Sequence, residues 1–388
     1  MGTRAPRLLA RLLVVLWAGA TLAAQPRPWL SGPELIAPGV EYFTSTDRSL
    51  VDSEGPIAVY LLKLDPAKAR LASVLSNDEV FDAEPVQPIA ARHHAIAAIN
   101  AGFFNTRNGE PVGLLKVAGE LVSDIGIPKG AVVIRSPPRG RTALEFDQIT
   151  ARVSMEFKAR GRRWVVPIDG VDTTRERGKL MLYTPAYHAD TDTAANGTEW
   201  VLQGRPLKVA DIRIDAGHTP IPRNGVVLSF GGLDLPDHLA ALARGVEVKL
   251  TTKWTTLNGV SAKHLENADH VVNGNGLLRV KSRILTEWLV ERFSGTDFTK
   301  MRHPRTFIGV DRKGFIWLGA IDGRQPDYSI GMNFAELQRL ADRLQLTDAL
   351  NLDGGGSTTM VIKNQIVNRP SDPTGPRPVS DAILVTIR

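Results

Sequence analysis

The strongest chemical signal in the sequence is an aspartate, Asp353, that stands between an apolar segment and a run of glycines. It is followed by Gly354, Gly355, Gly356, Ser357 and Thr358. Glycine lets a ligand approach the main chain closely, so an acid followed by three glycines predicts a binding loop. The main-chain amides of residues 354–357 are candidates for holding an anion. A tight turn between two strands is the structural alternative.

Two further segments end in a polar residue soon followed by glycine. Asn100 precedes Gly102, and Asp322 precedes Gly323 and Arg324. The apolar runs 315–321 and 349–352 flank a helical pattern, and this order predicts a crossover that joins two parallel strands. Because ligands bind beyond the carboxyl ends of parallel strands, we expect Asp322 and Asp353 side by side, with Asn100 in the same pocket.

Two carboxylates in one pocket suit two kinds of chemistry. One is glycosidic cleavage by an acid and a base or nucleophile; the other is metal-assisted attack on phosphate. Arg305 precedes a strand-like run, and its planar guanidinium could bind phosphate. His303 and Arg377 are weaker candidates of the same kind. The sequence alone leaves the two chemistries open.

The sequence gives no support for several other classes of enzyme. Ser357 does not fit the Gly-x-Ser-x-Gly nucleophile elbow, because Thr359 stands where the second glycine is required. The Gly-Lys-Ser/Thr ending of a P-loop is also absent from this run. Without any cysteine, the chain has no thiolate nucleophile, no disulfide and no Cys-type zinc site.

The composition is that of a globular protein with little net charge. The chain has 388 residues, of which 43% are hydrophobic, and a formal net charge of +6. Arg4, Arg7 and Arg11 contribute three of these charges within a segment that we expect to be removed. The remaining charge gives no indication of nucleic-acid binding.

The first residues have the pattern of a secretory signal peptide. The three arginines precede an apolar run and then small residues, which predicts a signal peptide at 1–24 with cleavage after Ala23 or Ala24. The run is short for a membrane span, although an uncleaved anchor is the alternative. We therefore expect an exported protein, periplasmic or extracellular, without a stable membrane span after cleavage.

The mature chain is predicted to be a lead-in at 25–55 and one catalytic domain at 56–388. The lead-in has one expected strand, near 40–43, and the segment 143–252 alternates short β-rich runs with breaks, which predicts an antiparallel section. A helix is expected to begin at Asn333, whose side chain and that of Glu336 fit a capping box. The predicted fold class is α+β, with a mixed, twisted β-sheet core, βαβ crossovers and this antiparallel β-rich middle section.

Five motifs, in their order along the chain, resemble those of the phosphodiester glycosidase family. They are Asn100-Ala101-Gly102-Phe103-Phe104, His303-Pro304-Arg305-Thr306-Phe307-Ile308-Gly309, Asp322-Gly323-Arg324, residues 351–359 and Arg377-Pro378-Val379-Ser380-Asp381. The resemblance covers residues 57–388 and implies hydrolysis of the bond between a sugar anomeric carbon and phosphate. The implied sugar is similar to N-acetylglucosamine, in an envelope or exopolysaccharide substrate. No cofactor is required, although Ca²⁺ or Mg²⁺ is a possibility.

On this resemblance the candidate residues take specific roles. Arg305 and the amides of residues 354–357 would hold the phosphate, Asp322 and Asp353 would flank the anomeric carbon, and Asn100 would orient a sugar hydroxyl. The remaining substrate-binding candidates are Gly102, Thr358, Arg324, Arg377 and His303. Two alternatives remain: a metal-dependent phosphodiesterase with both aspartates as ligands, and a non-catalytic envelope glycan-binding protein.

Overall fold

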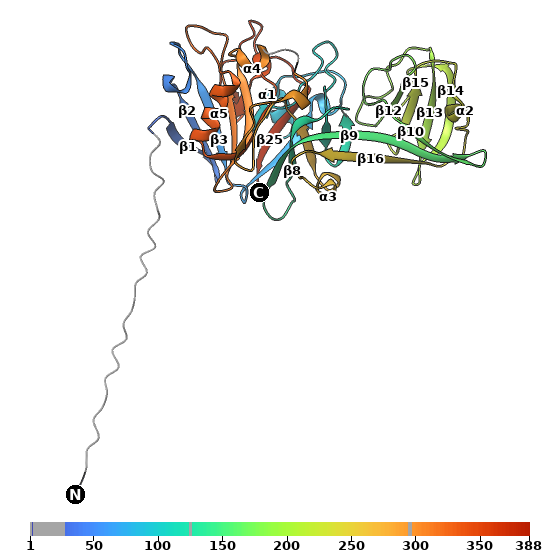
Figure 1. Cartoon of the computed structure of the whole chain (residues 1–388), viewed down its shortest axis with the longest axis horizontal. Helices are drawn as coiled ribbons and strands as arrows, with labels where there is room; N and C mark the ends of the chain where they lie inside the picture. Colours follow the sequence, from blue (N-terminus) through green and yellow to red (C-terminus); the bar gives the residue numbers. More distant parts are fainter. Residues whose placement is uncertain (1, 3–27, 124–125, 294–296) are drawn as a thin grey trace.

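The computed structural model describes residues 2, 28–123, 126–293 and 297–388. The predicted signal peptide, apart from residue 2, lies outside the described residues. The described chain forms a larger body, and a smaller group of strands lies at the end of two long strands (Figure 1). Among the described residues we find no helix with the length and apolar character needed to cross a membrane.

An eight-stranded sheet forms one layer of the body. In spatial order its strands are β1 (Ser31–Ala37), β2 (Val40–Ser45), β3 (Val59–Leu64), β21 (Ile316–Ile321), β20 (Arg305–Asp311), β22 (Leu346–Asn351), β18 (Leu277–Val280) and β19 (Arg283–Ile284). Each neighbouring pair in this sheet is antiparallel. The segment expected to be a lead-in thus supplies two strands, β1 and β2, rather than one.

The predicted mixed sheet with βαβ crossovers is wrong, because the described sheets are almost entirely antiparallel. The expected parallel neighbours β21 and β22 do not pair with each other. β21 is bonded on one side to β3 and on the other to β20, with which it forms a hairpin, so β22 pairs with the far edge of β20. The strand–helix–strand order was therefore correct, but both edges of β21 were already occupied by antiparallel partners.

A second, five-stranded antiparallel sheet packs against the first. Its order is β24 (Gln365–Ile366), β23 (Met360–Ile362), β5 (Ala97–Asn100), β25 (Asp381–Ile387) and β4 (Ala69–Leu75). The largest apolar cluster contains residues of both sheets, such as Leu62 and Leu318 from the first and Ile99 and Ile383 from the second. Helix α1 (Val86–Arg92) covers the other face of this second sheet.

Helix α5 (Phe334–Arg343) covers the outer face of the eight-stranded sheet. Its apolar side packs on Phe307, Trp317 and Ala349. The predicted capping box is confirmed: the Asn333 side chain accepts a hydrogen bond from the Glu336 amide, and the Glu336 carboxylate accepts one from the Asn333 amide. The helix therefore begins where the sequence predicted.

Removal of this cap should destabilise the protein without changing its chemistry. Asn333→Ala leaves the Glu336 amide without its acceptor, so we expect the free energy of unfolding to fall by about 1 kcal/mol. Denaturant unfolding of the variant and the wild type measures the difference. An unchanged midpoint would show that the cap contributes nothing to stability.

The predicted antiparallel middle section is confirmed. One sheet has the order β10 (Arg162–Pro167), β9 (Ala143–Ala159), β8 (Lys129–Arg135), β17 (His270–Asn273), β6 (Leu115–Val117) and β7 (Glu120–Ser123), with β16 (Val248–Thr256) paired to β9. The other has β11 (Gly170–Val171), β12 (Leu180–Tyr183), β15 (Gly225–Phe230), β13 (Gly197–Gln203) and β14 (Lys208–Ala216). Within the described residues, β11 and β12 form the one parallel pair of strands. Short helices complete the structure: α2 (Asp237–Ala240), α3 (Ala262–Glu266) and α4 (Asp297–Lys300).

Candidate active site

The two sheets of the body bring their polar strand ends to one place. Because β20 runs antiparallel to both β21 and β22, its first residues lie beside the last residues of those two strands. In the second sheet the end of β5 lies beside the start of β25 by the same geometry. The residues at or next to these ends are Asn100, Arg305, Thr306, Asp322, Asp353 and Asp381.

Asn100 joins the two sheets through its side chain. This fully buried amide donates a hydrogen bond to the main-chain carbonyl of Asp353, at 2.8 Å. Its Oδ1 accepts hydrogen bonds from the Thr306 hydroxyl, at 2.8 Å, and from the Thr359 amide, at 3.1 Å. Its side chain is therefore engaged in fixing the loop that carries Asp353, rather than free for the sugar contact that the sequence suggested.

The same network reaches Asp322 through the other end of the loop. The hydroxyl oxygens of Thr306 and Thr358 lie 3.4 Å apart, and because Thr306 gives its one proton to Asn100, it accepts in this second contact. The Asn368 amide donates both to the Thr358 carbonyl, at 3.0 Å, and to Asp322 Oδ1, at 2.8 Å. Asp322 and Asp353 thus belong to one hydrogen-bonded assembly, with the start of β20 between them.

Asp322 is buried and held by several donors. Oδ1 accepts from Asn368, and Oδ2 accepts from the Arg369 amide, at 2.8 Å. The hydroxyls of Tyr328 and Tyr60 also bond to this carboxylate. Burial raises the pKa of Asp322, and these hydrogen bonds lower it. Both oxygens therefore already accept an N–H group, which fixes the orientation of the carboxylate.

Asp353 is partly exposed, and its pKa is raised to about 6. Desolvation is the main cause, and the neighbouring charge of Asp381 adds to it. The neighbouring Ser357 hydroxyl, the hydrogen bond from the Gly354 amide and the positive charge of Arg377 act in the opposite direction on this pKa. A carboxyl group with this pKa can exchange a proton near neutral pH, as a general acid or base must.

A third acid, Asp381, was missed as a candidate site residue. It is fully buried, and its Oδ1 accepts hydrogen bonds from the Gly102 amide and the Ser380 hydroxyl, both at 2.9 Å. Burial raises its pKa to about 6. The signal in the sequence was its place in the motif that begins at Arg377, but only the pairing of β25 with β5 brings it to Gly102, which it holds in place.

The glycine loop does not offer the free amides that we predicted. The Gly354 amide donates to the Asp353 side chain, at 2.8 Å, and the Gly355 amide donates to the Pro304 carbonyl, at 2.9 Å. The Ser357 amide donates to the Gly354 carbonyl, at 3.2 Å, in a short 3₁₀ turn. Three of the four amides proposed for phosphate are thus used inside the protein.

The glycines are needed because two arginines lie close against them. A Cβ at Gly355, whose φ is +63°, would lie 3.0 Å from Arg324 Nη2. A Cβ at Gly356 would lie 2.3 Å from Arg377 Nη2 and 2.2 Å from an oxygen of Asp372, which forms a bidentate ion pair with Arg377. The loop therefore lies between two arginines, of which Arg324 is exposed and Arg377 is ion-paired with Asp372.

His303 lies beside the exposed Arg324. The distance from Arg324 Nη2 to His303 Nδ1 is 3.3 Å. Since a guanidinium only donates, Nδ1 accepts, and the imidazole proton stands on Nε2. Burial, Arg305 and Arg324 lower the pKa of His303, so its ring is neutral near pH 7. It can therefore offer an N–H to an anion without adding a charge.

Arg305 has a different position from the one that we predicted. The residue is 1% exposed, and its guanidinium donates to the carbonyls of Met332, Phe298 and Met301. It also lies over the rings of Phe298 and Phe334, at 5.1 and 4.8 Å. Arg305 thus fixes the loops around the site, and its donors are directed mainly at the main chain.

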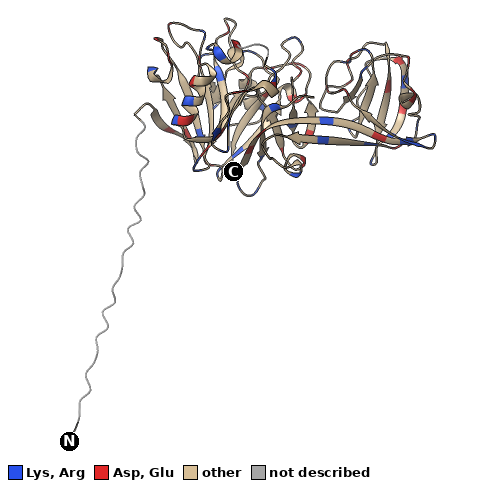
Figure 2. Cartoon of the chain, in the orientation of Figure 1, with Lys and Arg blue, Asp and Glu red and all other residues tan. Residues whose placement is uncertain are grey.

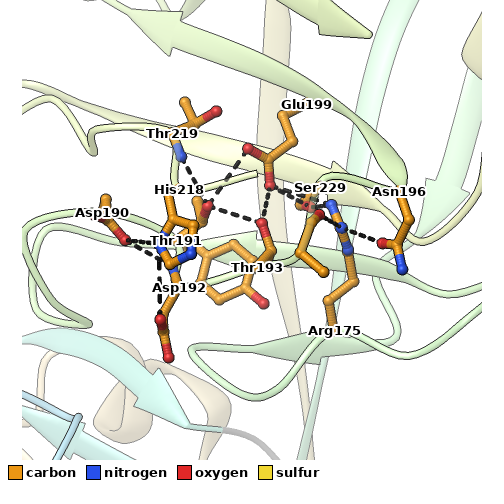
Figure 3. Close-up of polar contacts among 12 residues, drawn as sticks. Arg175, Asp190, Thr191, Asp192, Thr193, Asn196, Glu199, His218, Thr219 and Ser229 are labelled. Atoms are coloured by element: carbon orange, nitrogen blue, oxygen red, sulfur yellow. Dashed lines mark hydrogen bonds and ion pairs between the residues drawn. The ribbon is translucent and has the colours of Figure 1, made fainter. Parts of the chain in front are cut away.

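A possible metal-binding group lies elsewhere, in loops next to β13 and β14. Ligand atoms of Asp190, Asp192 and His218 lie within 4.8 Å of one another, and the histidine contacts both acids (Figure 3). Beside it Glu199 is fully buried among hydroxyl donors and Arg175 (Figure 3). The contacts of His218 with both acids account for the first group, and structural hydrogen bonding accounts for the second.

Comparison with known proteins relates the chain to a family and to several solved structures. Residues 196–386 match the model of the phosphodiester glycosidase family. The N-acetylglucosamine-1-phosphodiester alpha-N-acetylglucosaminidase of Mus musculus is 32% identical over 100 residues, which is 26% of this chain and 19% of that protein. The chain therefore aligns with less than a fifth of the length of this relative.

Two bacterial structures share the fold. A hypothetical protein from Synechocystis superimposes with a TM-score of 0.74, covering 91% of this chain and 63% of the other. A protein from Burkholderia pseudomallei whose name describes it as exported has a TM-score of 0.73, covering 86% and 75%. Each is 24% identical to this chain, so the likeness concerns the fold alone.

Proposed function

Because the segment 196–386 matches the model of the phosphodiester glycosidase family, we propose that this chain hydrolyses the bond between a sugar anomeric carbon and phosphate in a glycosyl phosphodiester. The observation that carries the proposal is the single hydrogen-bonded assembly that holds Asp322 and Asp353 beside a loop flanked by two arginines. The family segment contains both aspartates and both arginines.

In the proposed mechanism the two acids have different tasks. Asp353, with its pKa of about 6, exchanges a proton with the leaving phosphate oxygen or with the attacking water. Asp322 is held by donors on both oxygens and stabilises positive charge at the anomeric carbon in the transition state. A phosphate leaving group is acidic by itself, so modest proton transfer is sufficient.

Phosphate binding is assigned to the side chains around the glycine loop. Arg324 is exposed next to Gly355 and can offer its donors to an incoming anion. His303 adds a neutral N–H from Nε2, and Arg377, which is ion-paired with Asp372, lies on the other side of the loop. Arg305 does not contact the phosphate in this proposal; it orders the surrounding loops through its hydrogen bonds to the Met332 and Phe298 carbonyls.

The finer features of the substrate rest on relatives. The name of the mouse relative refers to N-acetylglucosamine joined to a phosphodiester, which supports a sugar of that kind here. The name of the Burkholderia pseudomallei protein supports export. An exported enzyme, periplasmic or extracellular, would meet phosphodiesters of envelope or exopolysaccharide glycans.

The direct test is incubation of the purified protein with an N-acetylglucosaminyl phosphodiester. Release of free reducing sugar together with a phosphomonoester is the expected result. Binding without release would favour the glycan-binding alternative. Cleavage of the other phosphate ester bond, with full loss of activity in a chelator, would favour the metal-dependent phosphodiesterase.

The raised pKa of Asp353 predicts that the plot of kcat/KM against pH has a limb, a region of falling activity, near this pKa. If the protonated carboxyl acts as the acid, kcat/KM falls as pH rises through about 6, because ionisation removes the proton to be donated. Asp381→Asn removes the neighbouring negative charge that raises this pKa, so the limb should move to lower pH. A limb that stays in place, or moves upward, would contradict the coupling between the two acids.

A further inference from the structure

The two long strands that connect the body to the smaller group of strands have one strongly basic face. We call it the basic arm face and define it by the exposed side chains of β9, β10 and β16 that point away from the apolar cluster beneath them. Its charged members are Arg152, Lys158, Arg163, Lys249, Lys253 and Glu156. Five cations therefore share this face with one acid.

The strand register places like charges directly opposite each other. Arg152 of β9 pairs with Lys253 of β16, and Lys158 of β9 pairs with Arg163 of β10. Directly opposed like charges destabilise an antiparallel sheet. The one acid, Glu156, already forms a bidentate pair with Arg163. The face therefore keeps an excess of positive charge that the strands themselves do not neutralise.

Four of these cations, all except Arg163, form no salt bridge among the described residues. Arg152 and Lys253 take part in none of the salt bridges of the described chain, and both are exposed. Two positions further along the strands, Ser154 pairs with Thr251 on the same face, and their hydroxyl oxygens lie 3.1 Å apart. Figure 2 shows blue positions on adjacent parts of these two strands. Cations next to hydroxyl groups offer the contacts that phosphate and sugar oxygens require.

We infer that the basic arm face binds a polyanionic glycan whose sugars are linked through phosphodiesters, and so holds a polymeric substrate outside the active site. The inference rests on the proposed function for the identity of the polymer and on charge complementarity for the surface. Nucleic acid is the other polyanion to consider, but this face has no exposed aromatic side chain on which a base could stack. The observations therefore favour the glycan.

The experiment measures binding of poly(glycerol phosphate) to the full protein in low and moderate salt. The double variant Arg152→Gln with Lys253→Gln should raise the dissociation constant about 10- to 30-fold. Each Lys or Arg near an anionic surface contributes to the binding free energy, and the variant loses two of these contributions. The matched control is Arg312→Gln with Lys313→Gln, an exposed pair in the turn between β20 and β21, and it should bind as the wild type does. Uncharged dextran should not bind to any of the proteins.

Turnover of a small glycosyl phosphodiester separates this inference from the proposed function. The double variant should release reducing sugar from it at the wild-type rate, because the changed residues lie outside the site. Equal polymer binding by the wild type and the double variant would overturn the inference, and so would tighter binding of single-stranded DNA of equal charge. A wild-type protein that binds the polymer through these residues but cleaves no glycosyl phosphodiester would contradict the proposed function alone.

Discussion

Asp353→Asn should lower kcat for a glycosyl phosphodiester by about 10²- to 10⁴-fold, the range in which general acid–base groups contribute. The amide keeps the size of the side chain and an oxygen for the Gly354 amide, but it cannot exchange a proton. Removing a raised-pKa carboxylate from a desolvated position should not destabilise the fold at neutral pH, because its ionisation opposed folding there. Steady-state kinetics together with thermal unfolding test both statements.

The matched control for this variant is Asp237→Asn, an exposed aspartate on α2. It makes the same chemical change far from the assembly and should leave kcat unchanged. Near-normal turnover in a folded Asp353→Asn protein would defeat the assignment of the acid. An equal loss in the control would point to general damage rather than to chemistry at Asp353.

Arg324→Met should lower kcat/KM by about 10²- to 10³-fold, as expected when one preorganised donor to a developing anion is lost. Methionine retains the apolar stem over the glycine loop while removing the guanidinium that lies beside Gly355 and His303. Inorganic phosphate should also inhibit the variant less than the wild type, because both ligands use the same donors.

Arg312→Met provides the control, since Arg312 is an exposed arginine in the turn between β20 and β21. Its kinetics should match those of the wild type. Unaltered inhibition by phosphate in Arg324→Met would mean that the phosphate group lies elsewhere. In that case Arg377, on the other side of the loop, would be the next residue to replace.

The family and several local elements could be predicted from the sequence. The resemblance to the phosphodiester glycosidase family is confirmed for the segment 196–386. The capping box at Asn333 is confirmed, because it depends on residues three positions apart that no distant contact disturbs. The antiparallel middle section is also confirmed, since alternating short runs separated by turns describe such a sheet directly.

Features that depend on distant partners could not be predicted in this way. The prediction that β21 and β22 are parallel neighbours was wrong, because the hairpin with β20 and the pairing with β3 occupy both edges of β21. The prediction that the amides of the glycine loop are free for an anion did not hold for three of the four, because Pro304 and the loop itself accept their hydrogen bonds. Asp381 was missed because its contact with Gly102 joins residues 279 positions apart.

The sequence by itself determined which residues are candidates for the chemistry: two strand-ending aspartates, a loop of three glycines and arginines within recognisable motifs. Local spacing was sufficient for this, because turns, caps and strand ends are encoded by neighbouring residues. Only the tertiary structure decided how they are used. Antiparallel pairing brought the start of β20 between the two acids, desolvation by the surrounding protein raised the pKa of Asp353, and side chains from distant loops placed the arginines beside the glycine loop.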